Sequence, residues 1–328
     1  MSEKEPGIPV VVAGLGEVGV AIARAALASA DLRLVGAVDP AHAGRRLDEL
    51  LGRGAGLEVE ADAARALRAA RGGVLLQATG SRLAEVLPQV EQAVRAGVCV
   101  VSTCEELAYP WLADEARADA LDALCERNDV AVVGAGVNPG LALDRLPALL
   151  SQATGEVRRL DARRVVDLAG RRASLARKAG VGLDEAGFQR AVEADAVGHV
   201  GLSQSAALAA LGAGLDVDEI EEGIEPVLAS RDVAGPLPVA RGRVAGVRQV
   251  ARGWLDGREV IRLEVELSVG AVDPRDEVLI EADPPLRLVI PGGLPGEAAT
   301  AWSVVHAAAA IPMLQGLVTV LDLPPGRS

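Results

Sequence analysis

Residues 8–19 read IPVVVAGLGEVG, and this stretch decides the fold of the first half of the chain. The apolar run Ile8–Ala13 predicts a buried parallel strand, and a helix is expected over Glu17–Ala28. The glycines between them allow a tight turn and let a pyrophosphate approach the free N–H groups where the helix begins. The pattern therefore predicts a dinucleotide-binding turn, formed by Gly14, Leu15, Gly16, Glu17, Val18 and Gly19.

A second strand and the acid that ends it favour this interpretation over a plain glycine turn. The run Leu32–Val38 ends at Asp39, which follows Gly19 by the roughly 20 residues that a dinucleotide fingerprint requires. Asp39 is expected to accept hydrogen bonds from the adenosine ribose, which favours NAD. Arg45 and Arg46 follow soon after. They are expected either to neutralise the 2′-phosphate of NADP or to form a solvated helix face, so the expected cofactor is NAD or NADP.

Short apolar runs and helical stretches alternate as far as residue 138. The runs are Val74–Ala78, Val98–Ser102 and Val130–Gly134, and the helices are expected over Arg82–Ala96 and Trp111–Asn128. This alternation predicts βαβ units and a Rossmann domain over residues 1–138. Residues that follow the strands are also assigned to the cofactor: Ala78, Thr79, Gly80 and Thr103.

The pattern changes after Asn138-Pro139-Gly140. Val260–Val269 alternates polar with apolar residues, which predicts a sheet with one wet face, and Asp256-Gly257 predicts a hairpin to a strand over Val244–Trp254. Two more helices are expected, over Gly198–Leu211 and Glu297–Ala310. The expected fold class is α/β, with the Rossmann domain followed by an α+β domain (139–296) that has a mixed open sheet. Residues 297–328 are expected to form a last helix and tail.

Composition narrows the function. The net charge of −13 and the pI of about 4.8 argue against nucleic acid and anionic membranes as partners. No apolar run approaches the roughly 20 residues of a membrane span, and Met1–Pro6 does not resemble a signal peptide. The chain has three cysteines and no Cys-x-x-Cys spacing, which argues against disulfides and a metal site. A cytoplasmic protein is expected.

A pair of glutamates follows the run Val98–Ser102. Ligands of open α/β sheets lie at the carboxyl ends of the strands, so a carboxylate here is expected beside the nicotinamide. Partial burial would raise its pKa and make it a general acid/base. Glu105 is the expected catalytic residue, whereas Glu106 is better explained as an acid at a helix start.

Six cations crowd one short segment: Arg163, Arg164, Arg171, Arg172, Arg177 and Lys178. Such a cluster can hold a substrate carboxylate, or it can be exposed surface paired with the surplus acids. Lys178 is one of only two lysines in a chain that otherwise uses arginine, which favours a specific role. His199, near a helix start, is expected either to donate to a polar substrate group or to be structural.

These stretches resemble the 2,4-diaminopentanoate dehydrogenases and the related native amine dehydrogenases. The N-terminal half is similar to dihydrodipicolinate reductase, although the His-His and Pro-Ser-Gly-Thr motifs of that enzyme are missing. The matching stretches run across nearly the whole chain: Ser102–Pro110, Gly136–Gly140, Arg163–Asp167, Gly198–Gly201, Pro291–Gly293 and Ala299-Thr300.

The resemblance implies oxidative deamination of an amine or diamino acid and, in reverse, reductive amination of a ketone with ammonia. It also implies a homodimer, a last helix that packs back on the first domain, and Glu105 as the catalytic acid/base. The implied substrate contacts are Asn138, Arg164, Asp167, Lys178, His199 and Thr300. The cations and the 2 % of aromatic residues favour a substrate with a carboxylate, such as 2,4-diaminopentanoate. The alternatives are an imine reductase and a non-catalytic dinucleotide sensor.

Overall fold

The computed structural model describes residues 7–53, 55–171 and 173–326. Met1–Pro6 and Arg172, both used in the sequence analysis, lie outside these ranges. The chain divides into two compact units. The first unit combines residues up to Leu141 with those from Pro295 onward, and the second unit is Ala142–Leu294. None of the helices in the described ranges has the length and apolar character needed to cross a bilayer.

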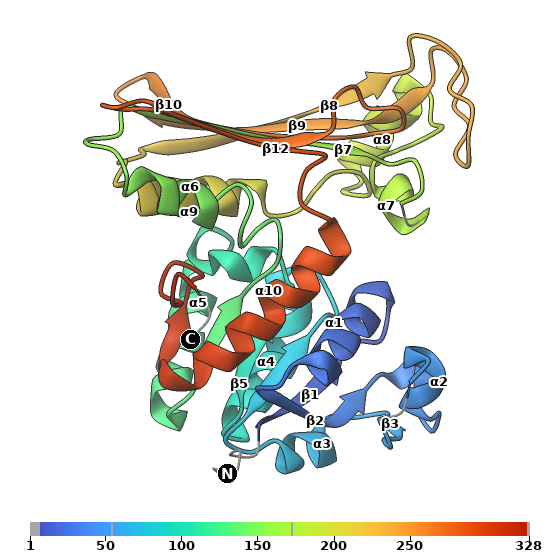
Figure 1. The fold of residues 1–328 in the computed structure, drawn as a ribbon, viewed down its shortest axis with the longest axis vertical. Helices are drawn as coiled ribbons and strands as arrows, with labels where there is room; N and C mark the ends of the chain where they lie inside the picture. Colours follow the sequence, from blue (N-terminus) through green and yellow to red (C-terminus); the bar gives the residue numbers. More distant parts are fainter. Residues whose placement is uncertain (1–6, 54, 172, 327–328) are drawn as a thin grey trace. The chain divides into compact units, whose positions relative to one another are not determined.

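A parallel seven-stranded sheet forms the centre of the first unit (Figure 1). Its order along the sheet is β3 (Val59–Glu60), β2 (Leu32–Val38), β1 (Ile8–Ala13), β4 (Val74–Gln77), β5 (Cys99–Ser102), β6 (Ala131–Gly134) and β13 (Gly316–Val318). Apart from the added β13, this is the doubly wound Rossmann order, so the expected fold class is confirmed. The order reverses between β1 and β4, which is where such sheets bind their ligands.

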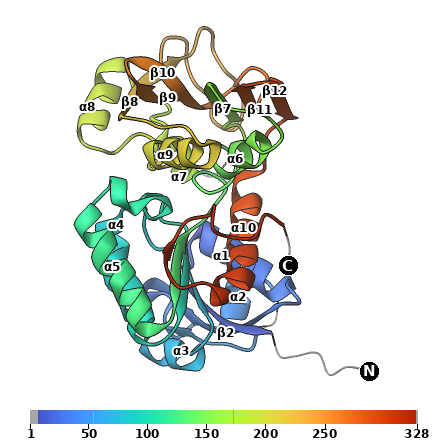
Figure 2. The same ribbon diagram turned by 90° about the vertical axis from the view of Figure 1, so that its left-hand side faces the viewer.

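Helices cover both faces of this sheet. α1 (Glu17–Ala28) contacts α10 (Gly296–Ala310), while α4 (Leu83–Arg95) and α5 (Glu115–Asn128) lie together on the other side (Figure 2). The expected start of a helix at Trp111 is wrong: Trp111 lies in a 3₁₀ turn, and α5 begins after Asp114, whose carboxylate accepts the Arg117 N–H at 3.0 Å. The shorter helices are α2 (Leu47–Leu51) and α3 (Ala64–Ala69).

The second unit contains a mixed six-stranded sheet. Its order is β12 (Leu286–Pro291), β11 (Arg275–Glu281), β7 (Arg159–Asp167), β10 (Arg258–Ser268), β9 (Val244–Leu255) and β8 (Glu219–Leu228). Only β7 and β10 pair in parallel, and the predicted hairpin joins β9 to β10. The expected mixed sheet is therefore confirmed.

Two helices, α6 (Arg145–Ser151) and α9 (Leu202–Ala213), lie against one face of this sheet (Figure 1). The helix expected from Gly198 begins only at Leu202, because Gly201 takes a φ of 92° and starts the helix as its N-cap. Residues 198–201 are therefore a loop. Two further helices complete the unit, α7 (Ala173–Lys178) and α8 (Glu185–Glu193).

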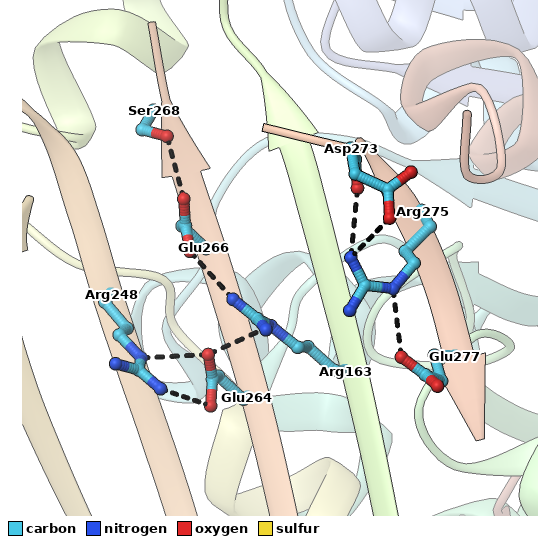
Figure 3. A network of polar contacts seen from close by, with 8 residues as sticks. All are labelled: Arg163, Arg248, Glu264, Glu266, Ser268, Asp273, Arg275 and Glu277. Carbon is cyan, nitrogen blue, oxygen red and sulfur yellow. Dashed lines mark hydrogen bonds and ion pairs between the residues drawn. The ribbon is translucent and has the colours of Figure 1, made fainter. Parts of the chain in front are cut away.

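The two faces of the sheet differ sharply in chemistry. The face against α6 and α9, called here the helix side, is largely apolar, with Leu160 and Leu263 fully buried. The other face, called the open side, carries the polar residues of β10, so the predicted alternation is correct. The prediction that these residues are wet is wrong for Glu264, which is only 6 % exposed because two arginines lie across it (Figure 3).

Candidate dinucleotide and substrate sites

A cleft of about 590 Å³ lies in the first unit at the carboxyl ends of β1, β2, β3 and β4. This position is the point where the strand order reverses. The cleft is lined by Gly14, Gly16, Val38, Asp39, Pro40, Ala61, Asp62, Ala63, Ala78, Thr79, Pro88, Gln89 and Gln92. Five of the residues predicted to bind the cofactor are in this set. The other six are Leu15, Glu17, Val18, Gly19, Gly80 and Thr103, and they are not among the lining residues.

Glycine is needed at the three positions of the turn for different physical reasons. A Cβ on Gly14 would lie 2.4 Å from the Ala78 carbonyl oxygen, and one on Gly19 would lie 1.7 Å from the Gly14 carbonyl oxygen. These two glycines are required by the packing of the chain itself. A Cβ on Gly16 would meet nothing within 4 Å. Gly16 therefore leaves open space at the N-terminus of α1, which fits an approaching pyrophosphate.

Asp39 places a negative charge in the cleft. Its carboxylate accepts hydrogen bonds from the Leu15 N–H at 2.6 Å and the Ala41 N–H at 2.8 Å. Burial by itself raises the pKa of Asp39, but these N–H groups and the neighbouring His42 hold it below its usual value. Asp39 is therefore ionised at neutral pH.

The two arginines considered for a 2′-phosphate are engaged elsewhere. Arg45 pairs with Glu49 at 3.2 Å and Arg46 with Asp48 at 2.6 Å, and neither lines the cleft. Both arginines are exposed and precede α2, so they form solvated ion pairs just before that helix and not a face of it.

The two glutamates, Glu105 and Glu106, have different surroundings in the structure. Glu106 accepts the Leu83 N–H at 2.6 Å and pairs with Arg82 at 2.8 Å, so it holds the start of α4. Glu105, half-buried, follows β5 and precedes the 3₁₀ turn Glu106–Ala108. Burial raises the pKa of the adjacent Cys104 to about 12, so this thiol is neutral at physiological pH. All three cysteines are buried and free.

Two predicted substrate residues of the first unit lie in contacting segments. The Val137 N–H, next to Asn138, donates to Thr300 Oγ1 at 3.2 Å. Gly140 closes this loop with a φ of 122°, and a Cβ there would lie 2.5 Å from the Gly136 nitrogen. Both facts require glycine at this position. α10 therefore fixes the Gly136–Gly140 loop across a large sequence separation.

The predicted cluster of six cations does not exist as one site. Arg163 and Arg164 are consecutive in β7 and point to opposite sides of the sheet. On the open side, Arg163 pairs with Glu264 and Glu266, each at 3.0 Å (Figure 3). On the helix side, the guanidinium of Arg164 pairs with Asp276 at 2.7 Å and donates to the Leu294 carbonyl at 2.6 Å.

Three polar residues lie in one row across the otherwise apolar helix side. Asp276 of β11 pairs with Arg164 of β7, Arg164 pairs with Val265 of β10, and Val265 pairs with Gln249 of β9. Val265 is therefore the one apolar member of this row. Asp276 is 2 % exposed, and burial raises its pKa despite the nearby Arg164 and the N–H of Leu294. Neither Asp276 nor Gln249 was predicted from the sequence. Gln249 carried a signal, because it stands between Val247 and Ala251 at an alternate strand position that is otherwise apolar.

Gln249 fixes the loop that carries His199. Its Oε1 accepts the His199 N–H at 2.8 Å, and its Nε2 donates to the His199 carbonyl at 2.7 Å and to Glu222. Glu222 in turn accepts the N–H and hydroxyl of Ser203 at the start of α9. The Gly198 N–H donates to the Lys178 carbonyl at 3.0 Å, which joins the loop of residues 198–201 to the end of α7.

The surroundings of His199 are electropositive. Burial, together with the charges of Lys178 and Arg164, lowers the pKa of His199 to about 4. The imidazole is therefore neutral at physiological pH, with one N–H donor. Asp167, also predicted to contact substrate, accepts the N–H groups of Ala169 and Gly270 at 2.9 and 3.0 Å and so holds a turn.

These features define a class: a dehydrogenase-type chain with a Rossmann unit and a separate α+β unit. A family model described as the 2,4-diaminopentanoate dehydrogenase C-terminal domain matches residues 141–328. The 2,4-diaminopentanoate dehydrogenase of Acetoanaerobium sticklandii is 30 % identical over 266 residues, which cover 78 % of this chain and 74 % of that protein.

Solved structures agree. The amine dehydrogenase of Mycobacterium smegmatis matches with a TM-score of 0.84 and 25 % identity over 98 % of this chain and 97 % of that one. A dihydrodipicolinate reductase of Paenisporosarcina shares the fold, with a TM-score of 0.55 and 13 % identity over 96 % and 98 % of the two chains.

The chain belongs to the 2,4-diaminopentanoate dehydrogenase family. The predicted resemblance is confirmed, and the chain is an oxidoreductase with a nicotinamide dinucleotide cofactor.

Proposed function

We propose that the protein oxidatively deaminates an amine that carries a carboxylate, of the 2,4-diaminopentanoate type, and catalyses the reverse reductive amination. In the forward direction the amine, water and the oxidised dinucleotide give a ketone, ammonia, the reduced dinucleotide and a proton. The observation that carries this proposal is the neutral His199 beside Lys178 and Arg164, within the segment that the family model matches. A carboxylate is the group that such positive surroundings favour.

The cofactor is proposed to lie in the cleft of the first unit, with its pyrophosphate at Gly16 and its adenosine ribose at Asp39. The nicotinamide supplies the redox chemistry in both directions. The expected preference is NAD, because the ionised Asp39 repels a 2′-phosphate and Asp62 lines the same cleft. Asp39→Ala should then lower the ratio of NAD to NADP affinity, and an unchanged ratio would remove Asp39 from the site.

Glu105 is proposed to move the protons. Deamination needs one group that takes a proton from the water attacking the iminium carbon and returns it to the departing ammonia. Glu106 is held by Leu83 and Arg82, so it is already committed to the start of α4. Glu105 lies after the carboxyl end of β5, the edge at which open α/β sheets bind their ligands, and this position supports its assignment as the acid/base.

The substrate carboxylate is proposed to bind Lys178 and the His199 imidazole N–H. Arg164 is left out of direct contact, because Asp276 and the Leu294 carbonyl engage its guanidinium. Lys178 is exposed at the end of α7 and close enough to His199 to lower the histidine pKa. Asn138 and Thr300 also remain proposed substrate contacts.

The test is NADH oxidation with ammonia, comparing 2-amino-4-oxopentanoate with cyclohexanone. Lys178→Met should raise KM for the keto acid about tenfold or more and leave cyclohexanone unchanged. Arg177→Met, which removes the neighbouring exposed cation, is the matched control and should affect neither substrate. If cyclohexanone is aminated as efficiently as the keto acid, the carboxylate site is wrong and a simple amine is the substrate.

The same assay separates the alternative functions. An imine reductase would oxidise NADH with a cyclic imine and without ammonia. A dinucleotide sensor would bind NADH without turnover of any ketone.

We also propose that the chain forms a homodimer. Leu279 and Val289 are exposed on the open side of the sheet, where a second copy could cover them. Light scattering should give twice the mass of one chain, and Leu279→Arg should lower that mass. A single-chain mass at micromolar concentration would contradict the proposal.

A further inference from the structure

A buried glutamine stands at the end of β4. Gln77 is 0 % exposed and follows three buried apolar residues, Val74–Leu76. Its Nε2 donates to the Val86 carbonyl at 3.4 Å and to Gln89 Oε1 at 2.7 Å. The Val86 carbonyl can only accept, so it fixes which end of the Gln77 amide is the donor.

This donor sets the orientation of Gln89. Gln89 Oε1 accepts from Gln77 and also from the Thr79 hydroxyl at 3.2 Å. With the oxygen turned toward Gln77 and Thr79, the side-chain NH₂ points the other way. No residue in the described ranges accepts a hydrogen bond from it, and Gln89 lines the cleft.

Stability alone does not account for the arrangement. A buried amide costs free energy unless its polar atoms are bonded, and Gln77 Oε1 is buried without a hydrogen-bond partner among the described residues. A leucine at this position would avoid that cost. What the glutamine adds is a fixed direction for the Gln89 amide.

We propose that Gln89 binds the cofactor, its side-chain NH₂ donating to an acceptor on the adenosine half of the dinucleotide. Gln77 and Thr79 are positioning residues for it. The adenosine half is assigned because Asp39, Pro40 and Ala63 line the same cleft as Gln89. The acceptor is a ribose oxygen or a ring nitrogen of adenine. This inference rests on the proposed placement of the cofactor in this cleft.

The test measures the Kd of NADH and of ADP-ribose by calorimetry. Gln89→Ala should raise both values about three- to tenfold, the effect of one lost hydrogen bond. Gln89→Glu keeps an oxygen for Gln77 and Thr79 but replaces the NH₂ with a second oxygen, so it should raise both values further. Gln77→Leu should raise them less, because Gln89 remains but is no longer oriented.

Two controls separate the possible failures. Glu91→Ala, on the same helix and paired with Arg95, should bind like the wild type. Gly16→Val should lose NADH, and normal binding by this variant would overturn the placement of the cofactor. If Gly16→Val loses binding while both Gln89 variants keep it, the role of Gln89 is wrong. Weakening of NADH but not of ADP-ribose would overturn the adenosine assignment. Thermal melting shows which variants fold.

Discussion

The side-chain amide of Gln249 holds His199 at both of its backbone polar groups, accepting from the N–H at 2.8 Å and donating to the carbonyl at 2.7 Å. Gln249→Met removes both bonds, so the His199 loop should lose its position. Each lost bond costs about 0.5–1.5 kcal/mol, so we expect KM for the keto acid to rise about tenfold or more. NADH affinity should be unchanged, because the cofactor is proposed to bind in the cleft of the first unit. Arg248→Met is the control, because Arg248 directly precedes Gln249 and its side chain lies on the open side. Equal losses in the two variants would contradict a positioning role.

Gly16→Ser should separate folding from cofactor binding. The serine side chain has open space at Gly16 and can cap α1, so the melting temperature should stay the same or rise. The same side chain fills the space proposed for the pyrophosphate, so NADH affinity should fall at least tenfold. Gly19→Ala should do the opposite and unfold the protein, because its Cβ meets the Gly14 carbonyl. Normal NADH affinity in Gly16→Ser would remove this turn from the site.

Glu105→Gln should lose activity, whereas Glu106→Gln should lose stability. Glu105→Gln is expected to lower kcat about 10²–10⁴-fold with an unchanged melting temperature. Glu106→Gln loses the ion pair with Arg82 and should lower stability by about 1 kcal/mol, with kcat within a few-fold of wild type. Stopped-flow turnover and urea unfolding measure the two effects. The reverse pattern would make Glu106 the acid/base.

Removing one partner of the buried pair Arg164 and Asp276 should lower the free energy of unfolding more than removing both. Arg164→Met leaves a buried carboxylate without its partner and is expected to cost about 3–5 kcal/mol. The double change Arg164→Met with Asp276→Leu should recover most of that loss. Arg163→Met, on the open side, is the control and should cost about 1 kcal/mol or less. A stable Arg164→Met that binds the keto acid poorly would return Arg164 to the carboxylate site.

His199 should make stability depend on pH. The folded protein holds its pKa at about 4, whereas the unfolded chain has an ordinary value near 6.5. Between these values the unfolded chain binds the proton more readily, so the free energy of unfolding should fall as pH drops from about 6.5 toward 4. One proton contributes a slope of at most about 1.4 kcal/mol per pH unit. Urea unfolding from pH 7 to 5 should show a flatter dependence in His199→Gln. Parallel curves would contradict this.

The sequence predicted best what neighbouring residues determine. The strand, the glycines of the turn and Asp39 follow one another along the chain, so their order alone predicted the Rossmann unit. The start of α5 was also within reach, because Asp114 is a recognisable N-cap that was not used.

What the sequence did not predict depends in part on strand register. Arg163 and Arg164 look alike in the sequence, yet one faces Glu264 and the other Asp276. Their partners are about a hundred residues away, and only the pairing of β7 with β10 and β11 brings them together. The Gln249–His199 contact joins β9 to a loop, and the Gln77–Gln89 contact joins β4 to α4, so neither depends on strand pairing. Both were missed because a side-chain amide gives no sequence pattern that identifies its partner.

The position of β13 and α10 has a consequence for biosynthesis. A ribosome releases the chain from its N-terminus, so β6 emerges long before β13, the strand that pairs with it. The second unit, which is continuous in sequence, is complete before the first unit can be. Until Pro295 and the residues after it emerge, α1 lacks its contact with α10 and the apolar edge of β6 stays unpaired. A product that stops short of this segment would therefore expose a strand edge open to aggregation, the defect that quality-control proteases and chaperones recognise.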